Sequence, residues 1–479
     1  MSAASATSRA VVSAAPTKSG GLRLPQFLGY AAGDAANNLA FSMTSMFLLL
    51  YYTDVVGIAA GAAGTLFLVV RIWDAFADMF AGRVVDRTMT RWGKFRPFFL
   101  FGAAPLLLLS VATFTVPGLA SGRTALVLAY VTYAALGLAY SLVNIPYGSL
   151  ASAMTQQPEE RGKLASFRMI GTATTIIMLA FVVAPQIQRF KGHPDRFQHS
   201  LLITTLGFAV VGFALYMFLF RTSRERVERD VAHVSMRQSL QTLKGNKPLL
   251  MLCLSSLAFL TGMFSLQTVQ AFYARDVLGD ANYIIILTVL STGAIFVVAP
   301  LIPRIVRTMG KKKGFIGFGA IGVLAGVGIS LAPASIPAIP MVFFGLMGVS
   351  VAGVNTLMWA LEADTVEYGE WKTGVRTEGI TYALFSFTRK LGQAVGGAMA
   401  AFAIGFGGYV GGAAHQSQRA LDWIGHSAGL IPALFTLIGI AIFLAYPLTE
   451  KTFAAMVAET KVRRAAAHGE GDLDGGAQA

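Results

Sequence analysis

Two carboxylates, Asp74 and Asp78, stand four residues apart inside a long apolar segment of the sequence. Residues with this spacing lie on the same face of a helix. Such a pair can bind a cation jointly, or repulsion between the two can hold one of them protonated. The alternative is that each acid pairs with Arg71 or with another buried base. The pair is therefore a candidate cation-coupling site.

A second group of polar residues lies in the first apolar segment, where Asp34 is followed one turn later by Asn37 and Asn38. Carboxylate and amide groups can hydrogen-bond several hydroxyls, as a sugar site requires. The alternative is hydrogen bonding between helices, worth about 1 kcal/mol or less for each bond. We interpret these three residues as candidate substrate contacts.

Basic residues also occur within apolar segments: Arg168 lies in one, and Arg389 and Lys390 stand together in another. A guanidinium binds a carboxylate through two parallel hydrogen bonds, so these residues indicate an anionic substrate. Adjacent helix residues point about 100° apart, so one of the two neighbours is expected to face a cavity. Alternatively, a base pairs with an acid such as Asp74 or Asp34. Asn144, two residues before Pro146, is a further candidate for both the cation and the substrate.

The composition of the chain indicates the surroundings in which these polar side chains lie. Hydrophobic residues make up 55% of the 479 residues and charged residues 13%, whereas soluble domains carry roughly a quarter charged residues. The chain is therefore expected to lie in a lipid bilayer. In that setting a charged side chain is costly and is a functional hypothesis by default.

The same counts exclude several functions. The net charge of +14 does not indicate a nucleic-acid partner, because the basic residues lie in short loops between apolar segments. One cysteine, Cys253, excludes an intrachain disulfide and a cysteine-based zinc site. The sequence has no phosphate-binding loop, zinc-protease motif or nucleophile elbow. We therefore expect neither an enzyme nor a cofactor.

Apolar segments of spanning length predict an all-α membrane protein with twelve transmembrane helices in two six-helix bundles. The segments are 27–51, 60–82, 98–117, 125–154, 164–187, 199–220, 249–274, 283–306, 315–334, 338–361, 377–409 and 427–447. The expected units are an N-terminal segment 1–24, a first bundle 25–220, a hydrophilic linker 221–247, a second bundle 248–450 and a tail 451–479. Both ends are expected to be disordered. No signal peptide is apparent, so the first helix is expected to direct insertion.

The positions of the basic residues predict how the chain is oriented in the membrane. They concentrate in the loops after the second, fourth, eighth and tenth segments and in the linker, which all fall on one side together with both termini. That side is predicted to be cytoplasmic. An acidic run at the same end of the tenth segment is expected to form salt bridges with these loops that open and close with the transport cycle, or else to be a solvated face; its members are Glu362, Asp364, Glu367 and Glu370. The motif Arg87-Thr88-Met89 recurs as Arg307-Thr308-Met309 and indicates two related halves.

Several motifs resemble the glycoside–pentoside–hexuronide:cation symporters of the major facilitator superfamily. They are Gly29–Asp34, Tyr52-Thr53-Asp54, Arg71–Ala75, Asp86-Arg87 with Arg91–Pro97, Asn144–Tyr147 and Asp364–Glu370. The resemblance runs from about residue 27 to 450. Within the family, Asp74–Asp86, Met154–Pro158 and Phe385–Lys390 are most similar to the branch that carries glucuronides.

The resemblance implies roles by position. In the melibiose branch, acids matching Asp74 and Asp78 form the cation site, but an Asn there is Ala77 here and an Asp there is Asn144 here. Both departures remove oxygen ligands, which favours a proton over sodium. A Lys-Asp pair of that branch is Asn37-Asn38 here, and its sugar-site bases match Arg168 and Lys390. Arg389 replaces an apolar residue, which makes it the candidate for the substrate carboxylate.

These interpretations predict a proton-coupled symporter in the cytoplasmic (inner) membrane that imports a glycoside, with a glucuronide or hexuronide as first choice. Its expected partners are a small sugar substrate, a coupling cation and the lipid bilayer. The alternatives are a carrier of neutral glycosides such as β-xylosides or galactosides, possibly sodium-coupled; a lipid carrier; and a membrane receptor that does not transport. The exact substrate, the ion stoichiometry and the oligomeric state do not follow from the sequence.

Overall fold

The computed structural model describes residues 21–155, 157–225, 245–374, 378–413 and 415–460. Within these ranges every regular element is a helix, and the sole β-type pairing is an isolated bridge between Thr90 and Gly93. The all-α prediction is therefore confirmed. Most of the predicted N-terminal segment 1–24, most of the linker 221–247 and most of the tail 451–479 lie outside the described residues.

The first bundle consists of six membrane-length units. Its elements are α1 (Leu24–Leu50), a π-helical turn η1 (Tyr51–Val55), α2 (Ala60–Arg87), α3 (Arg96–Phe101), α4 (Ala103–Thr113), η2 (Val116–Leu119), α5 (Gly122–Met154), α6 (Pro158–Arg189) and α7 (Pro194–Thr222). Helices α3 and α4 form one crossing that is interrupted at Gly102.

The second bundle repeats this plan. Its elements are α9 (Lys247–Phe272), a π-helical turn η3 (Tyr273–Val277), α10 (Tyr283–Val298), η4 (Ala299–Leu301), α11 (Ile302–Met309), α12 (Lys311–Leu331), α13 (Ala338–Thr373), α14 (Glu378–Phe406), α15 (Gln418–Ala428) and α16 (Leu430–Leu444). Pro300 lies where α10 gives way to α11, because proline has no N–H for the helical ladder. The last crossing is interrupted at Gly429.

Twelve crossings follow from these elements. Nine helical units among the described residues are long and apolar enough to span a membrane. The α3–α4 pair, with 6 and 11 residues, supplies another. Helices α1 (27 residues) and α14 (29 residues) are also long enough, and both carry the polar and charged residues predicted for the site.

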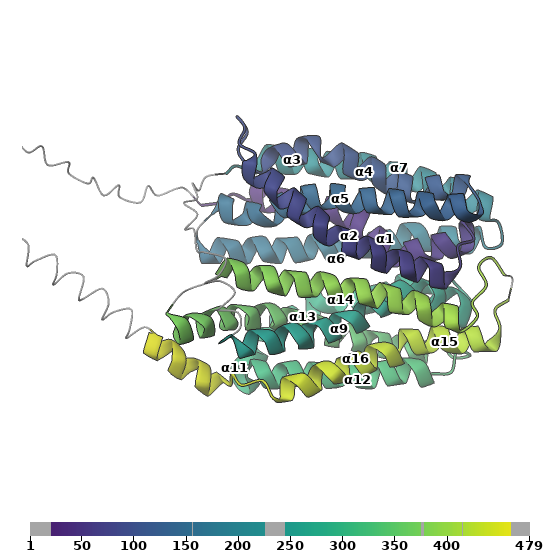
Figure 1. Ribbon diagram of the computed structural model, residues 1–479. Coiled ribbons are helices and arrows are strands. Elements are labelled where there is room, and N and C mark those ends of the chain that lie inside the picture. Colours follow the sequence, from purple (N-terminus) through teal and green to yellow (C-terminus); the bar gives the residue numbers. More distant parts are fainter. Residues whose placement is uncertain (1–20, 156, 226–244, 375–377, 414, 461–479) are drawn as a thin grey trace, which may run out of the picture.

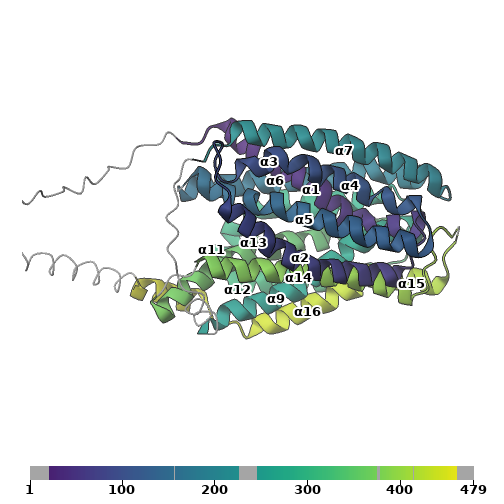
Figure 2. The same cartoon turned by 45° about the horizontal axis from the view of Figure 1, so that its top comes forward.

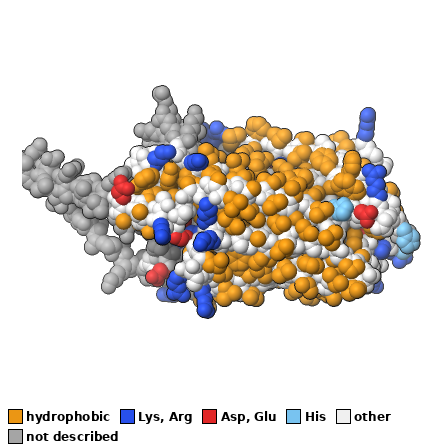
Figure 3. Space-filling view, turned by 90° about the horizontal axis from the view of Figure 1, so that it is seen from below, with side chains coloured by type: hydrophobic (Ala, Val, Ile, Leu, Met, Phe, Trp, Pro, Cys, Tyr) orange, Lys and Arg blue, Asp and Glu red, His pale blue; other side chains and the backbone are white. Residues whose placement is uncertain are grey.

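The two bundles lie side by side, with their helices running in the same general direction (Figures 1 and 2). The described chain begins and ends at one end of the molecule, which we call the near end; the turns after α1 and α14 lie at the opposite, far end (Figure 1). A broad apolar belt covers the surface between ends that carry Lys and Arg (Figure 3). This distribution matches a protein that crosses a bilayer.

The bundles contact each other where α2 packs on α14, α6 on α10 and α1 on α9. At the far end the approach of α2 to α14 is especially close. A Cβ on Gly64 would lie 3.1 Å from the Phe402 ring, and one on Gly405 would lie 3.0 Å from the backbone nitrogen of Gly61. Small residues thus let the start of α2 and the end of α14 approach closely, as in other membrane helix pairs.

Candidate functional site between the bundles

Asp34 and Arg168 form an ion pair inside the first bundle. Oδ1 of Asp34, on α1, lies 2.9 Å from Nε of Arg168, on α6. The other carboxylate oxygen accepts hydrogen bonds from Asn38 at 3.0 Å and from Thr172. The Asp34 side chain is 3% exposed and that of Arg168 is 43% exposed. Asp34 therefore holds Arg168 in place, and Arg168 is the partner that presents its charge to solvent.

Asn37 lies apart from this pair. Its side chain is buried, and its Oδ1 accepts a hydrogen bond of 2.8 Å from the Tyr216 hydroxyl on α7. This is the bonding between helices set out as the alternative to substrate contact. The neighbouring Asn38 instead joins Asp34, because adjacent residues point in different directions around a helix.

Asp74 pairs with Arg71 one turn earlier on α2. The Nη1–Oδ2 distance is 3.2 Å, and Arg71 also donates a hydrogen bond of 3.3 Å to the Tyr133 hydroxyl on α5. The second oxygen of Asp74 is buried and has no hydrogen-bond partner among the described residues. That oxygen faces Gly137, where an added Cβ would lie 2.1 Å away. One acceptor oxygen of Asp74 therefore has no donor among the described residues. Helix α5 can lie this close to it because residue 137 is a glycine and has no side chain.

Asp78 links the two bundles. One carboxylate oxygen accepts a hydrogen bond of 2.7 Å from Ser141 on α5, and the other pairs with the ammonium of Lys390 on α14. Lys390 is also within electrostatic range of Asp74. Both acids therefore pair with bases, as the alternative interpretation of this pair expects. Since the Asp78 pair crosses between the bundles, its strength depends on how the bundles are placed.

Asn144 lies on α5, three residues after Ser141, and is half-buried. The structure gives it no hydrogen bond to another described residue. Among the described residues, no group of three or more His, Cys, Asp or Glu side chains could hold a metal ion.

Arg389 has a different environment from its neighbour Lys390. It donates a hydrogen bond of 3.0 Å to Oδ1 of Asn355 on α13, and its guanidinium lies over the Trp359 ring at 4.9 Å. The Trp359 ring in turn stacks on Tyr382 at 6.0 Å. No carboxylate pairs with Arg389 within the part of the chain that the structure describes.

Trp359 and Tyr382 belong to the central region and not to the lipid face. Tyr382 is within electrostatic range of Arg168 in the first bundle and of Arg389 in the second. Both aromatic side chains are partly exposed, at 36% and 48%. Sequence reasoning missed them, together with Asn355, Ser141 and Tyr133. Tyr382 stands two helical turns before Arg389 on α14, a spacing that places both on one face. The other four residues lie on different helices from the charged residues that they contact, so no spacing in the sequence links them.

At the near end, Asp364 of the acidic run forms an ion pair of 2.7 Å with Lys311, which begins α12. The predicted salt bridge between this run and the basic loops is thereby confirmed for Asp364. Glu225, three residues after the end of α7, accepts three backbone hydrogen bonds from residues 94–96.

Comparison with known proteins shows which family and which relatives this chain resembles. The sequence profile described as MFS/sugar transport protein matches residues 29–450. A glucuronide carrier protein homolog of Escherichia coli (strain K12) is 46% identical over 441 residues, which cover 91% of this chain and 95% of that protein. An isoprimeverose transporter of Lactiplantibacillus pentosus is 34% identical, covering 82% of each chain.

The fold also matches solved transporters. A bacterial homolog of the human lysosomal transporter Spinster, in an inward-facing and unoccupied conformation, superposes with a TM-score of 0.65 at 13% identity, covering 91% of this chain and 99% of that chain. At this identity the likeness concerns the fold alone. Together with the family profile and the relatives, it leads to one conclusion. The chain is a multi-pass membrane protein that belongs to the glycoside–pentoside–hexuronide:cation symporter family, among the sugar transporters of the major facilitator superfamily.

Proposed function

We propose that this sugar symporter imports a glucuronide or another hexuronide together with a proton. The observation that carries the substrate proposal is Arg389, a guanidinium between the bundles with no carboxylate partner among the described residues. Asn355 and the Trp359 ring fix its orientation. A carboxylate is the partner that a guanidinium binds most specifically, through two parallel hydrogen bonds.

The aromatic pair beside Arg389 supports a glycoside. A sugar ring has an apolar face of C–H groups, and the partly exposed Trp359 and Tyr382 rings offer it a flat apolar surface next to the guanidinium. Arg168, held by Asp34, supplies hydrogen-bond donors to hydroxyls from the first bundle. Substrate would therefore contact both bundles at once, as alternating access around a central site requires.

The carboxylates on α2 support coupling to a proton. Asp78 accepts from Ser141 and pairs with Lys390, and Asp74 has Arg71. Among the described residues, no further carboxylate joins these two acids to build the oxygen cage that a metal cation prefers. A proton needs a single carboxylate oxygen. Protonation of Asp78 would release Lys390 and so loosen the tie between α2 and α14.

Uptake into membrane vesicles tests the proposal. Radiolabelled glucuronide is expected to accumulate when the outside is made acidic, and to equilibrate without accumulation when the pH gradient is collapsed. Accumulation that follows a sodium gradient at constant pH would contradict proton coupling. Failure of unlabelled hexuronides to compete with a transported neutral glycoside would contradict the substrate class.

The second candidate is a carrier of neutral glycosides. The identity with the isoprimeverose transporter favours it, and so does the hydroxyl-binding chemistry of the Asp34–Arg168 pair. In that case Arg389 would bind hydroxyls, and neutral sugars would compete better than their uronic acids.

A further inference from the structure

The first helix of each bundle ends in the same way. Helix α1 ends in the π-helical turn Tyr51–Val55 and α9 in the π-helical turn Tyr273–Val277. The sequences are Tyr-Tyr-Thr-Asp-Val and Tyr-Ala-Arg-Asp-Val, and each Asp is followed three residues later by a glycine with positive φ (76° and 82°). The two turns are therefore equivalent parts of the two halves, and they differ chiefly in that the second carries an arginine.

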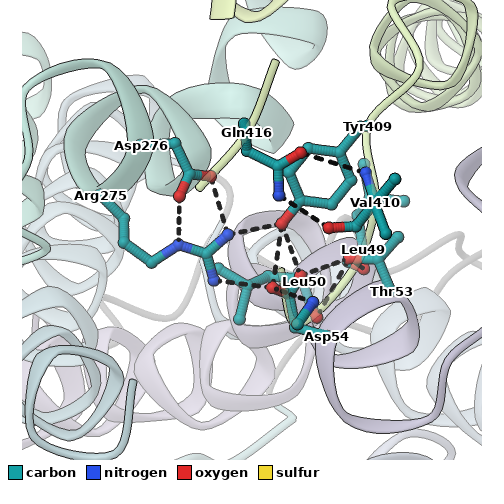
Figure 4. A network of polar contacts seen from close by, with 10 residues as sticks. Leu49, Leu50, Thr53, Asp54, Arg275, Asp276, Tyr409, Val410 and Gln416 are labelled. Atoms are coloured by element: carbon teal, nitrogen blue, oxygen red, sulfur yellow. Dashed lines mark hydrogen bonds and ion pairs between the residues drawn. The ribbon is translucent and has the colours of Figure 1, made fainter. Parts of the chain in front are cut away.

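This arginine connects the two turns across the interface (Figure 4). Arg275 donates a hydrogen bond of 3.0 Å from Nη1 to Asp54 of the first bundle. The guanidinium also forms two bonds of 2.9 and 2.7 Å with Asp276, its own neighbour. One guanidinium thus bridges the equivalent aspartates of both halves.

A third segment completes the contact. Tyr409, three residues after the end of α14, places its hydroxyl 2.9 Å from both carboxylate oxygens of Asp54, and it accepts a bond of 2.5 Å from Arg275. Burial raises the pKa of the Tyr409 hydroxyl, so it stays protonated and can donate to Asp54. The Gly412 N–H also donates to Asp54, at 3.3 Å.

The contact is tight and almost dry. The side chains of Arg275 and Asp54 are 8% and 12% exposed. A Cβ on Gly411 would lie 2.0 Å from the carbonyl oxygen of Thr53, so the loop after α14 rests directly on the end of α1. These groups cannot separate without breaking every inter-bundle bond among them.

We propose that Asp54, Arg275, Asp276 and Tyr409 form a latch that holds the far end of the transporter closed and must break for that end to open. Asp54 is the element of the latch in the first bundle; Arg275 and Tyr409 are those in the second. Asp276 is a positioning residue, since it orients the guanidinium from within its own bundle. A buried charge left without its partner is costly. When the latch opens, water must therefore reach the separated charges, or these charges must find new partners. The latch does not depend on which solute is carried.

Distances between spin labels, measured by double electron–electron resonance in lipid nanodiscs, test the latch directly. In a Cys253→Ala background, one pair of labels is placed at the far end on Arg123→Cys and Asp422→Cys, both at exposed positions. A second pair is placed at the near end on Met89→Cys and Met309→Cys, which are 78% and 55% exposed. We expect Asp54→Asn and Arg275→Gln each to raise the far-end-open population roughly tenfold or more. The far-end distance lengthens and the near-end distance shortens in step.

Three further variants make the result decisive. Arg419→Gln removes an exposed arginine of the same end, bonded to the carbonyl of Phe406, and is expected to leave both distances unchanged. Tyr409→Phe keeps the ring packed on Phe272 and removes only the hydroxyl, so a smaller shift in the same direction is expected even if the charge variants fold poorly. The exchange Asp54→Arg with Arg275→Asp is expected to restore the closed population. Unchanged distances in Asp54→Asn, Arg275→Gln and Tyr409→Phe, or an equal shift in Arg419→Gln, would overturn the latch.

Discussion

Replacing Arg389 by glutamine is expected to weaken the binding of anionic substrates much more than the binding of neutral ones. The change removes the guanidinium but keeps a planar polar group beside Trp359 and Phe385, whose ring centres lie 4.9 and 5.9 Å from the guanidinium carbon. A hydrogen bond to a charged group is worth about 1.5–3 kcal/mol. Since about 1.4 kcal/mol is a factor of ten in affinity, uptake of a hexuronide is expected to need about ten to a hundred times more substrate.

A neutral glycoside with the same aglycone is the internal control, because it has no carboxylate to lose. Its apparent affinity is expected to change about fivefold or less, because a neutral hydrogen bond is worth about 1 kcal/mol. Both are measured as competition against one labelled substrate in vesicles with equal amounts of folded transporter. Lys390→Gln is the contrasting variant: it removes the partner of Asp78 and is expected to impair uptake of both substrates. Equal losses for the two substrates in Arg389→Gln, or no loss at all, would refute the carboxylate role.

Three other changes test the remaining contacts. Asp78→Asn is expected to abolish accumulation driven by a pH gradient while exchange of labelled for unlabelled substrate continues, which counterflow assays measure. Gly137→Ala places a methyl group 2.1 Å from the free oxygen of Asp74 and must displace it by about an ångström, so proton-driven uptake is expected to fall about ten- to a hundredfold; Gly148→Ala, on the same helix with open space around its Cβ, is the control. Tyr216→Phe leaves the buried amide oxygen of Asn37 without a donor, and a loss of about 1–3 kcal/mol is expected as a lower thermal midpoint with substrate affinity unchanged.

Most of the fold follows from apolar periodicity and length, but the ends of its helices do not. The apolar part of α13 ends near residue 361, yet the helix continues to Thr373 through the acidic run, where Asp364 pairs with Lys311. The last segment was predicted to begin at 427, whereas α15 begins at Gln418 and breaks at Gly429. There a Cβ would lie 2.3 Å from the carbonyl oxygen of Gly326, a contact that hydropathy cannot reveal.

The candidate site was predictable as a set of residues but not as a set of pairs. Asp34 and Arg168 are 134 residues apart, and Asp78 and Lys390 are 312 apart. Which base meets which acid depends on the packing of α1 on α6 and of α2 on α14, and no local spacing encodes it. The latch was hidden for the same reason, although Tyr52-Thr53-Asp54 and Ala274-Arg275-Asp276 are visible as matching stretches once their structural equivalence is known.

The paired π-helical turns also show how closely the two halves correspond. A π turn contains one residue more than an α-helical path of the same extent, and such an insertion is rare. Both turns lie at the same place, and the backbone bonds Ile58–Tyr52 and Asp280–Ala274 repeat at a constant offset. The two aspartates therefore occupy equivalent positions in the two halves. Arg275 stands where the first half has Thr53, and its guanidinium pairs with both carboxylates, so a single side chain joins groups of like charge.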